Sequence, residues 1–209
     1  DREKWIDAWA ARVSKAPERF LLVEVANEYW QNGFDSPDAV GVLGARLKKA
    51  TSVLVAPSAP QCVDCIAEWR ALHAGGLIDV ATPHFSRDLR GPLGARGPVC
   101  DPLSMRNVPR EITRTFVSNE PIGPQSSVQQ DADPTRLADA ARVTWLTGGA
   151  AYTLHTGAGI RGGGTFDRDR GRSANLWEVP GIERILEALR RAQSEAASGA
   201  RRVICPPDL

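Results

Sequence analysis

The sequence lacks the features that would place it in several specialised classes of protein. No run approaches the roughly 20 consecutive apolar residues that span a bilayer, and four cysteines in 209 residues are too few for a disulfide scaffold. Charge of one sign is not in excess, because 26 Lys and Arg nearly balance 25 Asp and Glu. Such a chain has no general field to attract nucleic acid or an anionic membrane. We expect neither partner, and instead a neutral ligand.

The composition that remains is that of a globular domain. Apolar residues make up 42% and charged residues 24% of the chain, close to the average for folded domains. The length suits one substantial domain but falls short of the roughly 250 residues of a complete eight-stranded α/β barrel. The residues Asp1 to Lys4 are not a signal peptide and the chain does not begin with Met, so this end does not define the compartment. A secreted or extracytoplasmic location is slightly favoured.

Short β-rich runs alternate with amphipathic stretches along the chain. This alternation is typical of repeated βαβ units on a parallel sheet, with helices covering the strands. The connections after the expected strands are long and rich in Gly, Pro and polar residues. In an α/β barrel such connections gather at the C-terminal face, where ligands bind. The expected strands cover residues 20–26, 52–56, 77–81, 114–118 and 150–155.

Helix starts are indicated by a capping side chain before proline. Ser36-Pro37 and Asp133-Pro134 both have this pattern, which satisfies backbone N–H groups of the first turn. In the first amphipathic stretch Trp5, Trp9 and Val13 recur at steps of four residues. We expect them to form the buried stripe of an N-terminal helix.

Two folds agree with this order of elements. The first is a (β/α)8 TIM barrel in which strands 4 to 8 are visible, with strands 1 to 3 upstream of Asp1 or absent. The second is a five-stranded doubly wound sheet, which needs no further strands. The barrel is preferred because of the motif described next.

Two of the expected strands end in the same dipeptide. Asn27-Glu28 follows the first of them and Asn119-Glu120 the fourth. On a parallel sheet both glutamates fall at the ligand-binding edge, and on an eight-stranded ring they lie across the mouth from each other. Glycoside hydrolysis needs two carboxyl groups, one on each side of the bond that is cleaved. The repeated dipeptide therefore indicates a catalytic pair.

With these motifs the chain resembles clan A of the glycoside hydrolases, the retaining (β/α)8 superfamily of cellulases, mannanases and β-galactosidases. The resemblance covers essentially the whole chain and implies one partial TIM-barrel catalytic domain over residues 1–209. It implies Glu28 as acid/base after strand 4, Asn27 as a ligand of the sugar 2-hydroxyl, and Glu120 as nucleophile after strand 7. The expected activity is retaining hydrolysis of a neutral oligo- or polysaccharide by double displacement. No cofactor or metal is expected, and an N-terminal segment would complete the barrel.

Further residues are expected at the same face as substrate contacts. His84 and His155 each end an expected strand, and Asn119 precedes the second glutamate. Trp30 and Trp177 lie in neighbouring loops, where their rings can stack on sugar faces. The two histidines with one carboxylate also make a familiar metal-binding set, although hydrogen bonding to sugar hydroxyls or plain packing of the two rings is preferred.

Other motifs leave different functions open. Cys62-Val63-Asp64-Cys65 could be a redox pair or half of a zinc site, but the second close pair of a zinc ribbon is missing. Structural disulfides or buried thiols are preferred for all four cysteines. The segment from Gly157 to Gly162 fits the dinucleotide-binding spacing G-x-G-x-x-G, yet no helix begins there to receive a pyrophosphate. A non-catalytic carbohydrate-binding or structural protein on the same barrel is the alternative to an enzyme.

Overall fold

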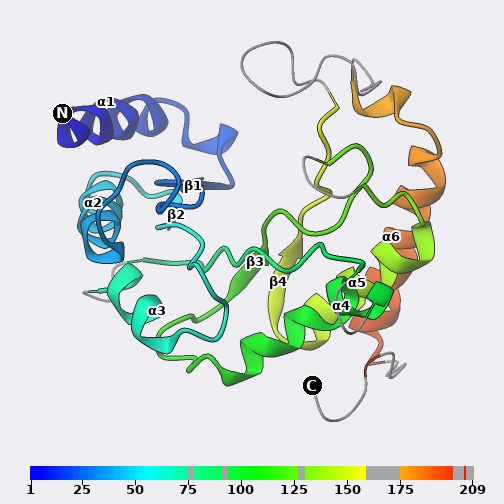
Figure 1. Ribbon diagram of the computed structural model, residues 1–209. Coiled ribbons are helices and arrows are strands. Elements are labelled where there is room, and N and C mark those ends of the chain that lie inside the picture. The colour runs from blue at the N-terminus through cyan, green and yellow to red at the C-terminus, as the bar shows by residue number, and fades with distance from the viewer. Residues whose placement is uncertain (75–77, 91–93, 127–129, 159–174, 200–204, 206–209) are drawn as a thin grey trace. The chain divides into compact units, whose positions relative to one another are not determined.

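The computed structural model describes residues 1–74, 78–90, 94–126, 130–158, 175–199 and 205 (Figure 1). The chain divides into two compact units. Unit 1 comprises Asp1–His84 and Ser104–Val117, and unit 2 comprises Phe85–Leu103 and Ser118–Leu209. Two elements contain a boundary between the units, η3 (Asp101–Asn107) and β3 (Phe116–Ser118).

Unit 1 combines helices with a parallel pair of strands. β1 and β2 pair with Leu22 opposite Leu54. Beyond β2, the backbone N–H groups of Asp79 and Val80 donate to the Val55 carbonyl at 3.0 and 3.3 Å. The elements of unit 1 are α1 (Arg2–Ser14), η1 (Pro17–Arg19), β1 (Leu22–Glu24), α2 (Pro37–Ala50), β2 (Leu54–Ala56) and α3 (Ile66–Leu72).

Helix α2 begins as the sequence predicts and packs on both α1 and α3. Ser36 is its N-cap, with Oγ accepting from the N–H of Ala39 at 3.3 Å, and Pro37 is the first helical residue. Gly41 permits a close approach to α3, because a Cβ there would lie 2.6 Å from the Ala71 carbonyl oxygen. In α1, however, Trp5 is 53% exposed. The buried stripe runs instead through Ile6, Ala10 and Val13.

Unit 2 is organised around helix α5, which packs on α6, β4 and α4. Asp133 caps α5 through a hydrogen bond from the N–H of Thr135 to Oδ1 at 2.9 Å, as the Asp-Pro signal predicts. The core of this unit includes Ile122 and a disulfide between Cys100 and Cys205. The elements are η2 (Gly94–Arg96), α4 (Gly97–Cys100), α5 (Pro134–Leu146), β4 (Gly149–Tyr152), η5 (Leu176–Glu178) and α6 (Ile182–Ala197).

The predicted (β/α)8 barrel with strands 4 to 8 is wrong. The described residues form six α-helices and two sheets of two strands each, β1 with β2 and β3 with β4. The doubly wound five-stranded sheet is not present among them either. The expected strand at 77–81 yields only an isolated bridge between Ala81 and Phe116.

The apolar runs explain why the sequence predicted more and longer β-strands than the structure contains. An apolar run indicates that a segment is buried, but it does not say how many ladder hydrogen bonds the segment makes. The strands that do form have three or four residues. Pro57 directly follows β2 and has no N–H to extend the ladder. Among the residues that the structure describes, no helix is long and apolar enough to cross a membrane.

Candidate functional site

Glu28, the first predicted carboxylate, lies in a tight turn shortly after β1. Its φ is 44°, in the left-handed region that residues other than glycine rarely adopt. The turn is held locally: the N–H of Gln31 donates to the Glu28 carbonyl at 2.8 Å. The side-chain amide of Asn32 donates to the same carbonyl at 3.1 Å and also to the carbonyl of Asn27. The exposed Asn27 thus helps to build the turn with its main chain.

Two partners hold the Glu28 carboxylate in unit 1. Oε1 lies 3.2 Å from Nδ1 of His84, and Oε2 accepts a hydrogen bond of 2.7 Å from Nε2 of Gln31. Both members of the Glu28–His84 pair are largely buried, with 22% and 10% of their side chains exposed. The structure therefore brings together two of the predicted site residues.

The neighbouring aromatic residues anchor this turn to the rest of unit 1. The Tyr29 N–H donates to Oγ of Ser58 at 3.1 Å, and its hydroxyl donates to Oε1 of Glu68 at 2.6 Å. Burial, together with the Glu68 carboxylate, raises the pKa of Tyr29, so the phenol remains a hydrogen-bond donor. Trp30 packs edge-to-face on Tyr29 with ring centroids 5.4 Å apart. The contact gives Trp30 a packing role, and its binding of sugar stays a prediction.

Glu120, the second predicted carboxylate, belongs to unit 2 and has nearly the same backbone conformation. Its φ is 47°. Oε2 accepts a hydrogen bond from Nη1 of Arg87 at 3.0 Å, and 23% and 13% of the two side chains are exposed. The same guanidinium nitrogen lies 3.2 Å from Nδ1 of His155. The preceding Asn119 is half-buried.

The loop after Glu120 is fastened to the segment after β4. Nδ1 of His155 lies 3.0 Å from the Pro121 carbonyl, which can only accept, and 3.2 Å from Nη1 of Arg87, which can only donate, so the two contacts require opposite tautomers. The Tyr152 hydroxyl donates to the Ile122 carbonyl at 3.2 Å. Burial and, less strongly, the negative charge of Asp131 raise the pKa of Tyr152. His155, a predicted sugar ligand, is thus one of the residues that position the Glu120 loop.

Gly123 leaves no room for a side chain in this arrangement. A Cβ at this position would lie 1.8 Å from the carbonyl oxygen of His155, so only glycine fits. Two residues further along the loop, the Gln125 carbonyl accepts a hydrogen bond from the N–H of Gly157 at 3.0 Å. The loop that carries Glu120 therefore lies directly on the backbone of the neighbouring segment.

Trp177 is the one predicted site residue that has no described contact with either turn. Trp177 lies in η5 and is 71% exposed. Most of the glycine motif, from residue 159 onward, lies outside the described residues, although Gly157 belongs to the contact just described. The cysteines form two disulfides, Cys62–Cys65 and Cys100–Cys205.

Sequence reasoning missed several polar residues that contact the site. Arg87 is the partner of Glu120, Gln31 binds Glu28, and Glu68 binds Tyr29. Gln31 follows Glu28 within one turn, so local spacing could have suggested it. Nothing in the spacing of Arg87 or Glu68 marks them, because their partners are far away in sequence.

Each turn thus presents a largely buried carboxylate with a nitrogen base or cation beside it. Glu28 has an imidazole nitrogen of His84 beside its carboxylate, whereas Glu120 has the positively charged guanidinium of Arg87. Such groups suit acid/base and nucleophilic roles. Comparison with protein-family models, with curated proteins and with solved structures finds no match for this chain.

Proposed function

We propose that this chain is a retaining glycoside hydrolase that acts on a neutral oligo- or polysaccharide, with Glu28 as acid/base and Glu120 as nucleophile. The observation that carries the proposal is the repetition of one local design. In each unit a strand is followed by Asn-Glu, the glutamate has a left-handed backbone, and a basic side chain contacts its carboxylate.

The backbone conformation argues that these glutamates are selected for chemistry. A left-handed backbone costs a residue other than glycine about 1–2 kcal/mol, and glycine or asparagine would fill either turn at lower cost. Among the described residues only Glu28, Glu120 and Gln125 adopt a positive φ without being glycine. Strained residues of this kind concentrate at functional sites.

The two carboxyl groups have complementary partners for double displacement. In the first step Glu120 attacks the anomeric carbon, and the leaving oxygen takes a proton from Glu28. In the second step Glu28 takes a proton from water, whose oxygen displaces Glu120 from the sugar. The Arg87 guanidinium favours the ionised form that the nucleophile needs, and His84 offers Glu28 a route for proton exchange.

The test is hydrolysis of a panel of aryl glycosides by the whole chain. We expect activity in the parent, loss to the detection limit in Glu120→Gln, and a decrease of about 10²–10⁴-fold in Glu28→Gln. The exposed Glu111→Gln is the matched control and should keep full activity. Proton NMR of the first product should show retention of the anomeric configuration.

Two results would contradict the proposal. Equal rates in the parent and Glu120→Gln would remove the nucleophile, and an inverted product would remove double displacement. Binding of oligosaccharide without any turnover would instead support the non-catalytic alternative.

A further inference from the structure

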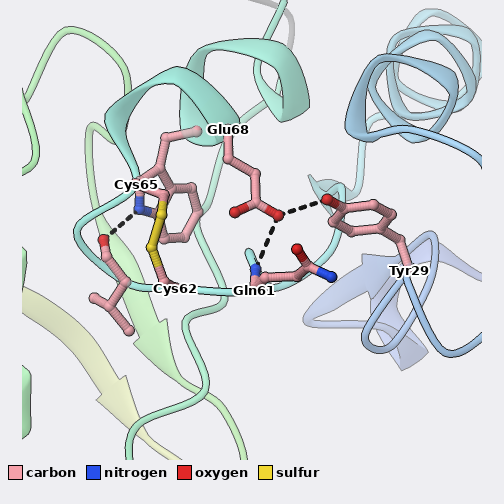
Figure 2. Close-up of a disulfide and its surroundings, with 7 residues drawn as sticks. Tyr29, Gln61, Cys62, Cys65 and Glu68 are labelled. Carbon is pink, nitrogen blue, oxygen red and sulfur yellow. Dashed lines mark hydrogen bonds between the residues drawn. A yellow bond between two sulfur atoms is a disulfide. The ribbon is translucent and has the colours of Figure 1, made fainter.

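Cys62, Cys65 and Glu68 form a corner of unit 1 whose two cysteines have no part in the proposed hydrolysis, and whose Glu68 only anchors Tyr29 (Figure 2). The two cysteines precede α3 and form a disulfide with Cα atoms 5.4 Å apart. Cys65 is exposed and Cys62 is half-buried. By contrast, Cys100 and Cys205 of the other disulfide are both buried. A reductant can therefore reach the first disulfide much more readily than the second.

Glu68 lies beside this disulfide. A carboxylate oxygen of Glu68 and the two sulfur atoms all lie within 4.8 Å of one another. The hydrogen bonds from Tyr29 and from the N–H of Gln61, 2.6 and 2.9 Å long, both end on Oε1. Figure 2 shows the other carboxylate oxygen on the side of the disulfide. A disulfide has no proton to donate, so the carboxylate gains no hydrogen bond from these sulfur atoms.

We propose that Cys62, Cys65 and Glu68 form a Zn²⁺ site once the disulfide is reduced, with water as the fourth ligand. Two thiolates and a carboxylate are a ligand set that Zn²⁺ accepts in tetrahedral geometry, at about 2.3 Å for sulfur and 2.0–2.2 Å for oxygen. The structure shows the oxidised form, in which the sulfur atoms bond to each other. The corner thus has two states, a disulfide and a metal site.

A dithiol reductant supplies the electrons and protons that convert the Cys62–Cys65 disulfide to two thiols. The reductant gives two electrons and two protons to the Cys62–Cys65 bond and becomes a disulfide itself. Zn²⁺ then displaces the two thiol protons as the sulfur atoms bind it, so metal binding releases protons and weakens at low pH.

The surroundings of the corner remain in place when the sulfur–sulfur bond opens. The fully buried Trp69 donates from Nε1 to the Val63 carbonyl at 2.7 Å and so holds the loop between the cysteines. Tyr29 and Gln61 hold Glu68 through Oε1. Such outer partners orient a metal ligand and raise the affinity of the site. Reduction therefore frees the two sulfur atoms without freeing the third ligand.

The experiment titrates Co²⁺ and Zn²⁺ into the full chain before and after mild anaerobic reduction. Co²⁺ bound by thiolates gives a charge-transfer absorption that free Co²⁺ lacks. We expect that absorption, with one metal per chain, only after reduction, and its displacement by Zn²⁺. Cys62→Ser and Cys65→Ser should each abolish it, and Glu68→Gln should weaken binding about tenfold or more.

The second disulfide supplies the matched control. A Cys100→Ala, Cys205→Ala variant should keep the absorption if it remains folded, and far-ultraviolet circular dichroism of every variant checks the fold. A reduced, folded chain without thiolate–cobalt absorption would overturn the site. So would absorption that persists in Cys62→Ser, or an affinity that Glu68→Gln leaves unchanged.

Discussion

The turn after β1 and the turn after β3 share a dipeptide and a backbone conformation, but they are held in different ways. The Glu28 turn is closed by its own neighbours, with Asn32 and Gln31 bonding within it. The Glu120 turn depends on a distant segment, through His155 and the close contact at Gly123. Both turns therefore have long-range support, through Ser58 and Glu68 in unit 1 and through His155 in unit 2, but the Glu28 turn is closed by its own neighbours as well.

The largest expected effect of a single change is at the long-range support of the Glu120 turn. Gly123→Ala puts a Cβ against the backbone oxygen of His155, and we expect it to lower the free energy of unfolding by about 3 kcal/mol or more. Gly181→Ala is the control, because φ is 77° there and no atom lies within 4 Å. Strain alone should cost that variant about 1 kcal/mol. Equal losses in urea unfolding would show that the contact at Gly123 is not rigid.

The second prediction concerns how the stability contributed by His73 of unit 1 depends on pH. Burial lowers the pKa of His73 in unit 1 to about 4, and neither ring nitrogen has a hydrogen-bond partner among the described residues. In the unfolded chain the pKa of His73 has its ordinary value of 6.5. Between about pH 6.5 and 4, His73 is therefore protonated in the unfolded chain but neutral in the folded chain. Stability is therefore fully present above about pH 6.5 and is lost as the pH falls toward 4.

The expected loss over that range is about 3 kcal/mol. It is measured by urea unfolding at several pH values, as the difference between the parent and His73→Phe, since both share every other titrating group. A difference that does not change with pH would mean that His73 is protonated in the folded protein or solvated.

The third prediction breaks the charge pair of unit 2. Arg87→Ala leaves the largely buried Glu120 carboxylate without its cation, and we expect a loss of about 2 kcal/mol at neutral pH. Gln31→Ala removes a neutral donor from Glu28 and should cost about 1 kcal/mol. Thermal unfolding at pH 7 measures both. Equal losses would contradict the idea that the two turns differ in their electrostatic support.

The smallest effect isolates the strained backbone that the two turns share. Glu28→Gly and Glu28→Ala remove the same carboxylate, but only glycine relieves the positive φ. We expect the glycine variant to be more stable by about 1 kcal/mol, and the same difference between Glu120→Gly and Glu120→Ala. Unfolding midpoints in urea provide the measurement. An alanine variant as stable as its glycine counterpart would remove the argument from strain.

The sequence predicted those parts of the structure that depend on near neighbours. Helix starts at Pro37 and Pro134 are correct because a capping side chain acts within one turn. The strand runs at both Asn-Glu motifs are present, though short. The barrel was wrong because sheet closure depends on pairing between remote segments, which an apolar run does not specify.

The details of the candidate site depended on interactions that the sequence does not display. Arg87 reaches Glu120 from far away in the chain, and no spacing rule relates them. The left-handed backbone of Glu28 is unexpected for this residue type. In α1 the periodicity was right, yet Ile6 rather than Trp5 faces the core, because an amphipathic ring tolerates exposure.

The Cys100–Cys205 disulfide closes a covalent ring over a sequence separation of 105 residues. Both Glu120 and His155 lie inside that ring. A protease that cuts one peptide bond within it produces two pieces that stay joined and migrate together until a reductant is added. A single cut in this part of the chain therefore does not release a segment from the protein.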